Sequence, residues 1–159
     1  MLFRSVGHKL DATLVADAID VHELKSGFQL SADQRAAVEH VCAGGGVSLI
    51  VGRAGTGKTA TAGAYMGAFE AAGYDVVSVS TATKAAGNLE RETERTAANF
   101  ARLIHALDSG KTKLTDKSVV VIDEAGMVSA RDFAAVQKAE RSEERRVGKE
   151  CRSRWSPYH

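Results

Sequence analysis

The stretch VSLIVGRAGTGKTAT, residues 47–61, decides the fold class of this chain. It opens with a short continuous apolar run, Val47 to Val51, which is the pattern of a strand covered on both faces of a sheet. Residues 52–59 then follow the spacing G-x-x-x-x-G-K-S/T completely, and a helix is predicted from about Gly57 to Ala72. Backbone N–H groups of such a loop converge on the phosphates of a nucleoside triphosphate. The alternative is a glycine-rich turn that carries a surface lysine.

The loop supplies the first set of candidate site residues. Lys58 is predicted to reach the β- and γ-phosphates, and the Thr59 hydroxyl is predicted to ligate Mg²⁺. The glycines allow the loop to turn and let its backbone approach the nucleotide closely. The candidate cofactor-binding residues of the loop are Gly52, Ala54, Gly55, Thr56, Gly57, Lys58 and Thr59.

The segment VVVIDEA, residues 119–125, supplies the expected acidic partner of the loop. An apolar strand delivers Asp123 from its carboxyl end, which is the end where ligands bind in a parallel sheet. We therefore expect Thr59 and Asp123 to hold the metal, Asp123 through water. Glu124 can polarise an attacking water, which favours hydrolysis over phosphoryl transfer and makes Lys58, Asp123 and Glu124 the candidate catalytic residues. The alternative is an acidic pair that ends a strand by chance.

Short apolar runs alternate with helical patterns along the chain. Strands are predicted at residues 76–80 and 119–123. Helices are predicted at 8–24, at 84–94 and from about Ser129, and another begins after a capping box formed by Ser31 and Gln34. A further helix is predicted from the spacing of Phe100, Leu103, Ile104 and Leu107. This alternation predicts an α/β fold in which helices flank a parallel sheet.

Length and composition exclude several other classes of protein. The chain has 159 residues, 44% hydrophobic and 26% charged, with a net charge of +1, so we expect one globular domain with no overall basic field. No apolar run is long enough to span a bilayer and the first residues lack a signal-peptide pattern, so we expect a cytoplasmic protein with no membrane partner. Cys42 and Cys151 lack CxxC spacing, which argues against a zinc site or a disulfide partner.

Five landmarks stand in a characteristic order over residues 28–138: LSADQ, GRAGTGKT, STATKAA, FARLI and VVVIDEAGMVS. In this order the chain resembles the RecD-like branch of superfamily 1 DNA helicases, and most of all the helicase part of TraA-type conjugative relaxases. The resemblance implies an incomplete RecA-like P-loop NTPase domain that uses ATP and Mg²⁺ to move along single-stranded DNA.

The resemblance also implies roles for residues outside the phosphate loop. Gln34 is similar to the family's glutamine that pairs with adenine, although its place in a capping box explains it equally well. The segment STATKAA, residues 80–86, is similar to a DNA-contacting loop, with Thr81, Thr83 and Lys84 as the candidate residues. The alternative for these threonines is a cap on the following helix.

The family pattern stops after residue 138. We expect residues 1–27 to form a helical linker, 28–138 a partial ATPase domain and 139–159 a disordered tail, which resembles a translated vector or adaptor sequence. A genuine basic arm is the alternative for that tail.

In the family's sheet, a strand that this chain lacks lies between the phosphate-loop strand and the Asp123 strand. We therefore expect those two strands either to close the gap or to leave a loose interior. The family's second RecA-like domain, with its arginine finger, is also missing, so we expect negligible turnover from this chain alone. A P-loop kinase and an inactive nucleotide-binding fragment are the alternative functions.

Overall fold

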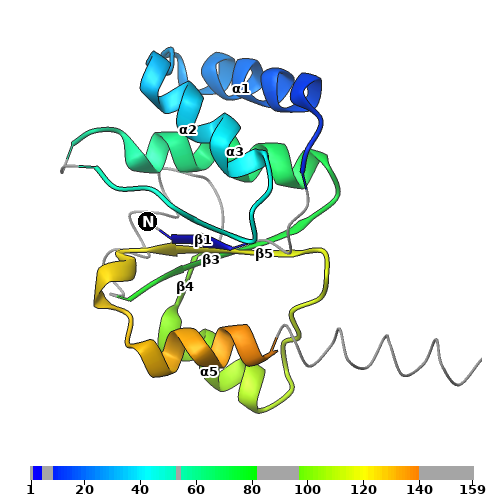
Figure 1. Cartoon of the computed structure of the whole chain (residues 1–159), viewed down its shortest axis with the longest axis vertical. Helices are drawn as coiled ribbons and strands as arrows, with labels where there is room; N and C mark the ends of the chain where they lie inside the picture. Colours follow the sequence, from blue (N-terminus) through cyan, green and yellow to red (C-terminus); the bar gives the residue numbers. More distant parts are fainter. Residues whose placement is uncertain (1, 5–8, 53–54, 82–96, 140–159) are drawn as a thin grey trace, which may run out of the picture.

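The computed structural model describes residues 2–4, 9–52, 55–81 and 97–139 (Figure 1). Its strands are β1 (Leu2–Arg4), β2 (Val47–Leu49), β3 (Asp75–Ser80), β4 (Ala97–Asn99) and β5 (Ser118–Asp123). Its helices are α1 (Ala12–Ser26), α2 (Ala32–Cys42), α3 (Lys58–Ala71), α5 (Phe100–Asp108), a 3₁₀ turn (Ala125–Met127) and a helix over residues 130–139. The strands form one sheet in the order β2-β1-β5-β3-β4.

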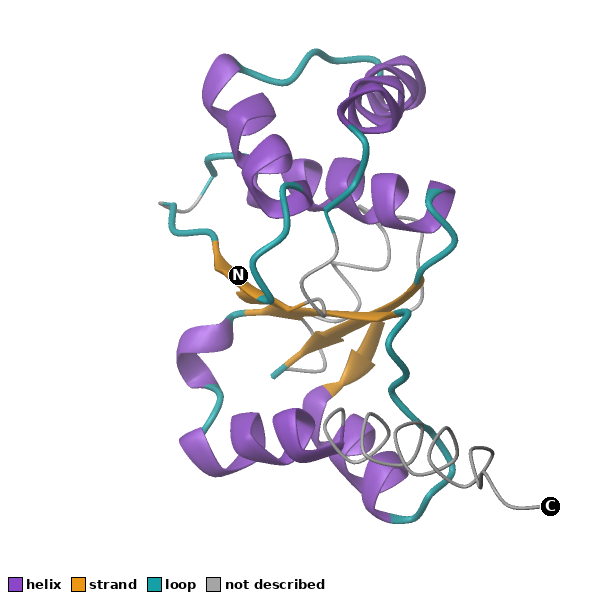
Figure 2. Cartoon of the chain, turned by 45° about the vertical axis from the view of Figure 1, so that its right-hand side comes forward, coloured by secondary structure: helices purple, strands orange, loops and turns teal. Residues whose placement is uncertain are grey.

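Helices cover both faces of this sheet, with α1, α2 and α3 on one side and α5 on the other (Figures 1 and 2). Alternate residues of β5 point to opposite faces of the sheet. Val119 and Val121 pack with α1, α2 and α3, whereas Val120 and Ile122 pack with α5 and the helix over 130–139. The strands predicted at 76–80 and 119–123 are present as β3 and β5, which pair in parallel over six residues. The predicted α/β fold, a RecA-like sheet flanked by helices, is confirmed.

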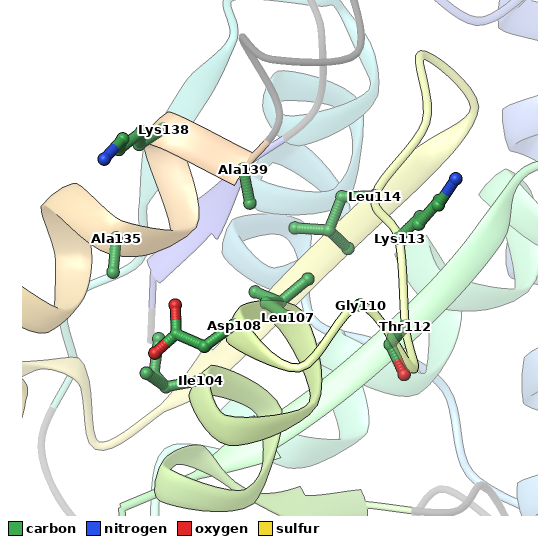
Figure 3. A pocket seen from close by; sticks show the side chains of 10 residues that line it. All are labelled: Ile104, Leu107, Asp108, Gly110, Thr112, Lys113, Leu114, Ala135, Lys138 and Ala139. Atoms are coloured by element: carbon green, nitrogen blue, oxygen red, sulfur yellow. The ribbon is translucent and has the colours of Figure 1, made fainter.

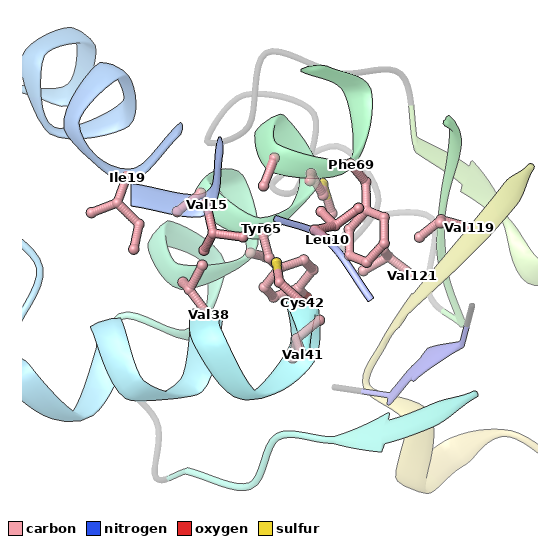
Figure 4. Close-up of a cluster of buried hydrophobic side chains, with 14 of the residues drawn as sticks. Leu10, Val15, Ile19, Val38, Val41, Cys42, Tyr65, Phe69, Val119 and Val121 are labelled. Carbon is pink, nitrogen blue, oxygen red and sulfur yellow. The ribbon is translucent and has the colours of Figure 1, made fainter. Parts of the chain in front are cut away.

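The larger core lies between the sheet and the first three helices (Figure 4). Tyr65, Met66 and Phe69 of α3 are fully buried there. Cys42 is also buried in this cluster, and its burial raises the pKa of the thiol to about 12.

Helix α1 is part of this core, although residues 1–27 were expected to be a helical linker. Asp11 caps the helix by accepting a hydrogen bond of 2.9 Å from the Thr13 N–H. Val15 and Ile19 of α1 are buried against α3. The two helices approach so closely that a Cβ on Gly63 would lie 2.7 Å from the His22 ring. In the described part of the chain, none of the helices combines the length and apolarity that crossing a membrane requires.

The first residues of the chain also enter the sheet, which was not expected. Strand β1 lies between β2 and β5 and is antiparallel to both. The two strands that were expected to lack a common neighbour therefore neither pair directly nor leave an open gap, because β1 fills the position. The three-residue strand β4 was not predicted either, since Ala-Ala-Asn has none of the β-branched or aromatic residues that mark a strand.

The expectation that residues 47–51 are covered on both faces is wrong for β2. Val47 and Leu49 are 44% and 61% exposed, and only Ser48 of this strand is buried. The reason is the position of β2 at the edge of the sheet. The cluster on the α5 side draws its strand residues from β3, β4 and β5 and contains none from β2.

Candidate functional site

The phosphate loop, Thr81 and the Asp123–Glu124 pair meet at the carboxyl edge of the sheet, which is the side where β2, β3 and β5 end. Leu2 pairs with Leu49 on one side and with Ile122 on the other, so β2 and β5 reach the same level. Ser80 pairs with Asp123, which brings the end of β3 to this level as well. These three strands run in the same direction, and their carboxyl ends form the edge at which ligands bind in such sheets.

The described part of the phosphate loop depends on its glycines. Gly55 and Gly57 adopt left-handed φ angles of 79° and 72°, which residues with a Cβ rarely reach. A Cβ on Gly52 would lie 2.7 Å from the Thr56 hydroxyl oxygen. Gly57 forms the N-cap of α3, so the free N–H groups of that helix begin where the loop ends. Ala54 lies outside the described residues.

Lys58 and Thr59 are the first two residues of α3. The Lys58 ammonium group donates a hydrogen bond of 2.7 Å to the Gly52 carbonyl and thereby spans the loop from end to start. This places the ammonium group over the turn in which the phosphates of a nucleotide would lie. Thr59 is partly buried at the same position.

Gln34 connects helix α2 with the phosphate loop. Its side-chain oxygen accepts a hydrogen bond from the Ser31 backbone N–H at 2.8 Å, and the backbone N–H of Gln34 donates to the Ser31 hydroxyl at 3.2 Å. The predicted capping box is therefore confirmed. The amide nitrogen donates to the Thr56 carbonyl at 3.1 Å. A Cβ on Gly57 would come within 2.3 Å of that nitrogen. The sequence pattern did not predict this contact with the loop.

Asp123 and Glu124 differ in their backbone environment. Asp123 ends β5 and accepts a hydrogen bond of 2.9 Å from the Glu124 N–H. Glu124 has a φ angle of 52°, the one positive value at a non-glycine position among the described residues. Such a conformation costs about 1–3 kcal/mol and is found mostly at functional sites. The Thr81 hydroxyl donates a long hydrogen bond of 3.5 Å to the Glu124 carboxylate.

Of the three predicted DNA-contacting residues, the structure describes Thr81. Its hydroxyl contacts the carboxylate of Glu124, a predicted catalytic residue. Thr83 and Lys84 lie outside the described residues, as does the helix predicted at 84–94. Sequence reasoning missed Ser80, which is fully buried opposite Asp123. The signal for it was the alternation of Ser78 and Ser80 in an apolar strand, since residues two apart share a face.

The alternation of β5 shows which face of the sheet Asp123 occupies. Burial raises the pKa of the hydroxyl of Tyr65, a residue of α3, far above its usual value, and the negative charge of Asp123 raises it further. Asp123 lies two residues after Val121, which packs in the α3 cluster, so it faces the α3 side of the sheet, the side on which the phosphate loop leads into that helix.

Other features of the described residues lie apart from this edge. A cavity of about 470 Å³ is bordered by apolar side chains of Ile104, Leu107 and Leu114, with Lys113 and Lys138 at its margin (Figure 3). It contains none of the predicted site residues. Within the described ranges, no three His, Cys, Asp or Glu side chains group as ligands for a metal ion.

These features define a P-loop α/β domain. A family model described as an AAA domain matches residues 29–148, more than half of the chain. The chain belongs to this AAA domain family. The match extends ten residues beyond the boundary expected at residue 138.

Three curated relatives each match about two thirds of the chain. It is 42% identical over 106 residues to the probable conjugal transfer protein TraA of Sinorhizobium fredii, and 41% and 37% identical to the conjugal transfer proteins TraA of Rhizobium radiobacter and Agrobacterium fabrum. Each match covers 67% of this chain and 10% of the relative. The resemblance to TraA-type proteins is confirmed, and the matched part spans about a tenth of the length of these curated relatives. No solved structure matches the chain.

Proposed function

We propose that residues 28–138 are the ATP-binding part of an ATP-dependent DNA helicase that acts in conjugal transfer and forms part of a longer cytoplasmic polypeptide. The observation that carries this proposal is the single sheet edge at which the phosphate loop, Asp123 and Glu124 come together. The relatives named as conjugal transfer proteins support the choice of process.

The residues at this edge fit a nucleotide with Mg²⁺. Mg²⁺ prefers oxygen ligands and keeps several of its waters, so Thr59 would ligate it directly and Asp123 would hold it through one of these waters. The left-handed glycines at 55 and 57 leave the loop backbone bare, and among the described residues no atom beyond the chain neighbours lies within 4 Å of a Cβ built on Gly55. When bound, Mg²⁺ neutralises charge on the phosphates and orients the terminal phosphoryl group.

The chain's own side chains then have distinct tasks. Lys58 exchanges the Gly52 carbonyl for phosphate oxygens, which is a short movement because the ammonium group already lies over the loop. The Glu124 carboxylate accepts a proton from the attacking water. Gln34, which lies beside the loop, contacts the base, and Thr81 contacts single-stranded DNA together with Thr83 and Lys84.

Titration of a fluorescent ATP analogue into this chain, with Mg²⁺ and with EDTA, tests the nucleotide site. Binding should require Lys58, so Lys58→Ala should abolish it, whereas Glu124→Gln should leave it intact. Failure of the unsubstituted chain to bind would refute the proposal.

Hydrolysis is measured in a longer polypeptide that contains these residues, because we expect negligible turnover from this chain alone. There, Glu124→Gln should stop hydrolysis while binding persists, and single-stranded DNA should stimulate the unsubstituted protein. Phosphate transfer to a small acceptor without any response to DNA would favour a P-loop kinase instead.

A further inference from the structure

The hydroxyl of Ser80 is a buried polar group at the carboxyl end of β3. Ser80 is 0% exposed at the end of β3, and its oxygen atom has no hydrogen-bond partner among the residues that the structure describes. An unpaired buried hydroxyl destabilises the folded state, and buried polar groups are nearly always paired. Its presence at this position therefore needs an explanation.

The sheet register shows where this hydroxyl points. Two residues earlier, the Ser78 hydroxyl contacts the Met66 sulfur of α3 at 3.6 Å, so Ser80 faces the same side. Ser80 pairs with Asp123 in the parallel ladder, and Asp123 shares its face with Val121, which packs in the α3 cluster. The hydroxyl and the carboxylate thus stand on neighbouring strands, on the same face and at the carboxyl edge.

We propose that Ser80 is a positioning residue for the metal-bound nucleotide, and this inference rests on the proposed function. Its hydroxyl hydrogen-bonds to a water molecule that the hydrated divalent cation shares with Asp123. The hydroxyl can both donate and accept, which suits it to orient such a water toward the carboxylate. Groups in this outer position fix the direction of the ligands of a metal and tune its affinity.

The substitution Ser80→Ala tests this role, and Ser78→Ala is its matched control. Both serines are buried on the same strand and face the same helix, but Ser78 has a partner in Met66. A fluorescent ATP analogue is titrated with Mg²⁺ and with EDTA, and thermal unfolding is followed without nucleotide. We expect Ser80→Ala to weaken Mg²⁺-supported binding about 10- to 100-fold and to leave binding in EDTA unchanged. Its unfolding temperature should stay the same or rise, because an unpaired hydroxyl is removed. Ser78→Ala should bind like the unsubstituted chain.

The possible outcomes separate the two claims. If the unsubstituted chain binds no nucleotide, the proposed function falls and the role of Ser80 falls with it. If the unsubstituted chain and Ser80→Ala respond equally to Mg²⁺, the role of Ser80 alone is refuted. An equal loss of affinity with Mg²⁺ and with EDTA, or a lower unfolding temperature, would also refute it, because the hydroxyl would then support the protein structure.

Discussion

Strand β1 lies between the two halves of the proposed nucleotide site, and a proline at Phe3 tests whether it keeps them apart. The strand is paired on both edges, so each of its backbone N–H groups faces a carbonyl of β2 or β5. Phe3→Pro removes one of these donors and leaves the opposite carbonyl without a partner. The expected loss is about 1–3 kcal/mol, a large share of the roughly 5–15 kcal/mol by which a domain of this size is stable.

The same substitution should reach the metal site through the spacing of the strands. Neighbouring strands lie about 4.8 Å apart, so β1 separates β2 from β5 by about twice that distance. Without β1, the exposed edges of β2 and β5 would pair, and the loop would shift by about one strand spacing relative to Asp123. Metal ligands must keep their distances within about 0.2 Å. The Mg²⁺-dependent part of the ATP affinity should therefore disappear.

The control for this experiment is Phe3→Ala, which removes the same side chain but keeps the N–H group. Urea unfolding gives the stability of both variants, and titration of a fluorescent ATP analogue with Mg²⁺ and with EDTA gives their affinities. We expect Phe3→Pro to be less stable than Phe3→Ala by about 1–3 kcal/mol and to lose the response to Mg²⁺. If both variants bind Mg²⁺-ATP alike, β1 does not set the spacing of the site.

Two further predictions concern the loop and the first helix. Gly57→Ala should lower the free energy of unfolding by at least about 1–2 kcal/mol, the cost of a left-handed residue with a Cβ, and displace the Gln34 amide. Gly73→Ala, at a φ of 82° with open space, is the control, and equal losses would show that the Gln34 contact contributes nothing. The hydroxyl and the N–H of Thr13 lower the pKa of Asp11 below 3.8, so its stabilisation is complete above that pH and is lost as the pH falls through the lower value. Asp11→Asn should remove this part of the acid dependence in urea unfolding, and an unchanged profile would contradict the assignment.

Local patterns predicted most of the elements that form the core. The capping box at Ser31 and Gln34 is present, because both hydrogen bonds join residues three apart. Phe100 and Leu103 are buried on α5 as their helical spacing predicted, and Ser129 caps the helix over 130–139 by accepting from the Asp132 N–H at 3.2 Å. In each case, the deciding interactions lie within one element or on one face of it.

The features that the sequence did not predict depend on distant pairing. Strand β1 has only three residues, and nothing in Leu-Phe-Arg indicates that it inserts between β2 and β5. The exposure of Val47 and Leu49 follows from the position of β2 in the sheet, since the same apolar run would be buried in a central strand. The left-handed Glu124 and its contact with Thr81 arise where two strands end together. Such properties depend on how elements pair and cannot be read from any one of them.

The position of Gln34 limits how the base of a nucleotide can be recognised. Its amide oxygen is bound to the Ser31 N–H, and its amide nitrogen is bound to the Thr56 carbonyl. Pairing with adenine uses both a donor and an acceptor of the amide, and only one N–H and one lone pair remain for it. If adenine displaces either existing bond, the exchange itself costs little, about 0.5–1.5 kcal/mol before the new bonds form. The displaced partner, however, is the N-cap of α2 or the loop residue beside Gly57. In the role proposed for Gln34, a base that displaced either bond would change the start of α2 or the turn proposed to hold the phosphates, and base recognition and phosphate binding would then be coupled through this one side chain.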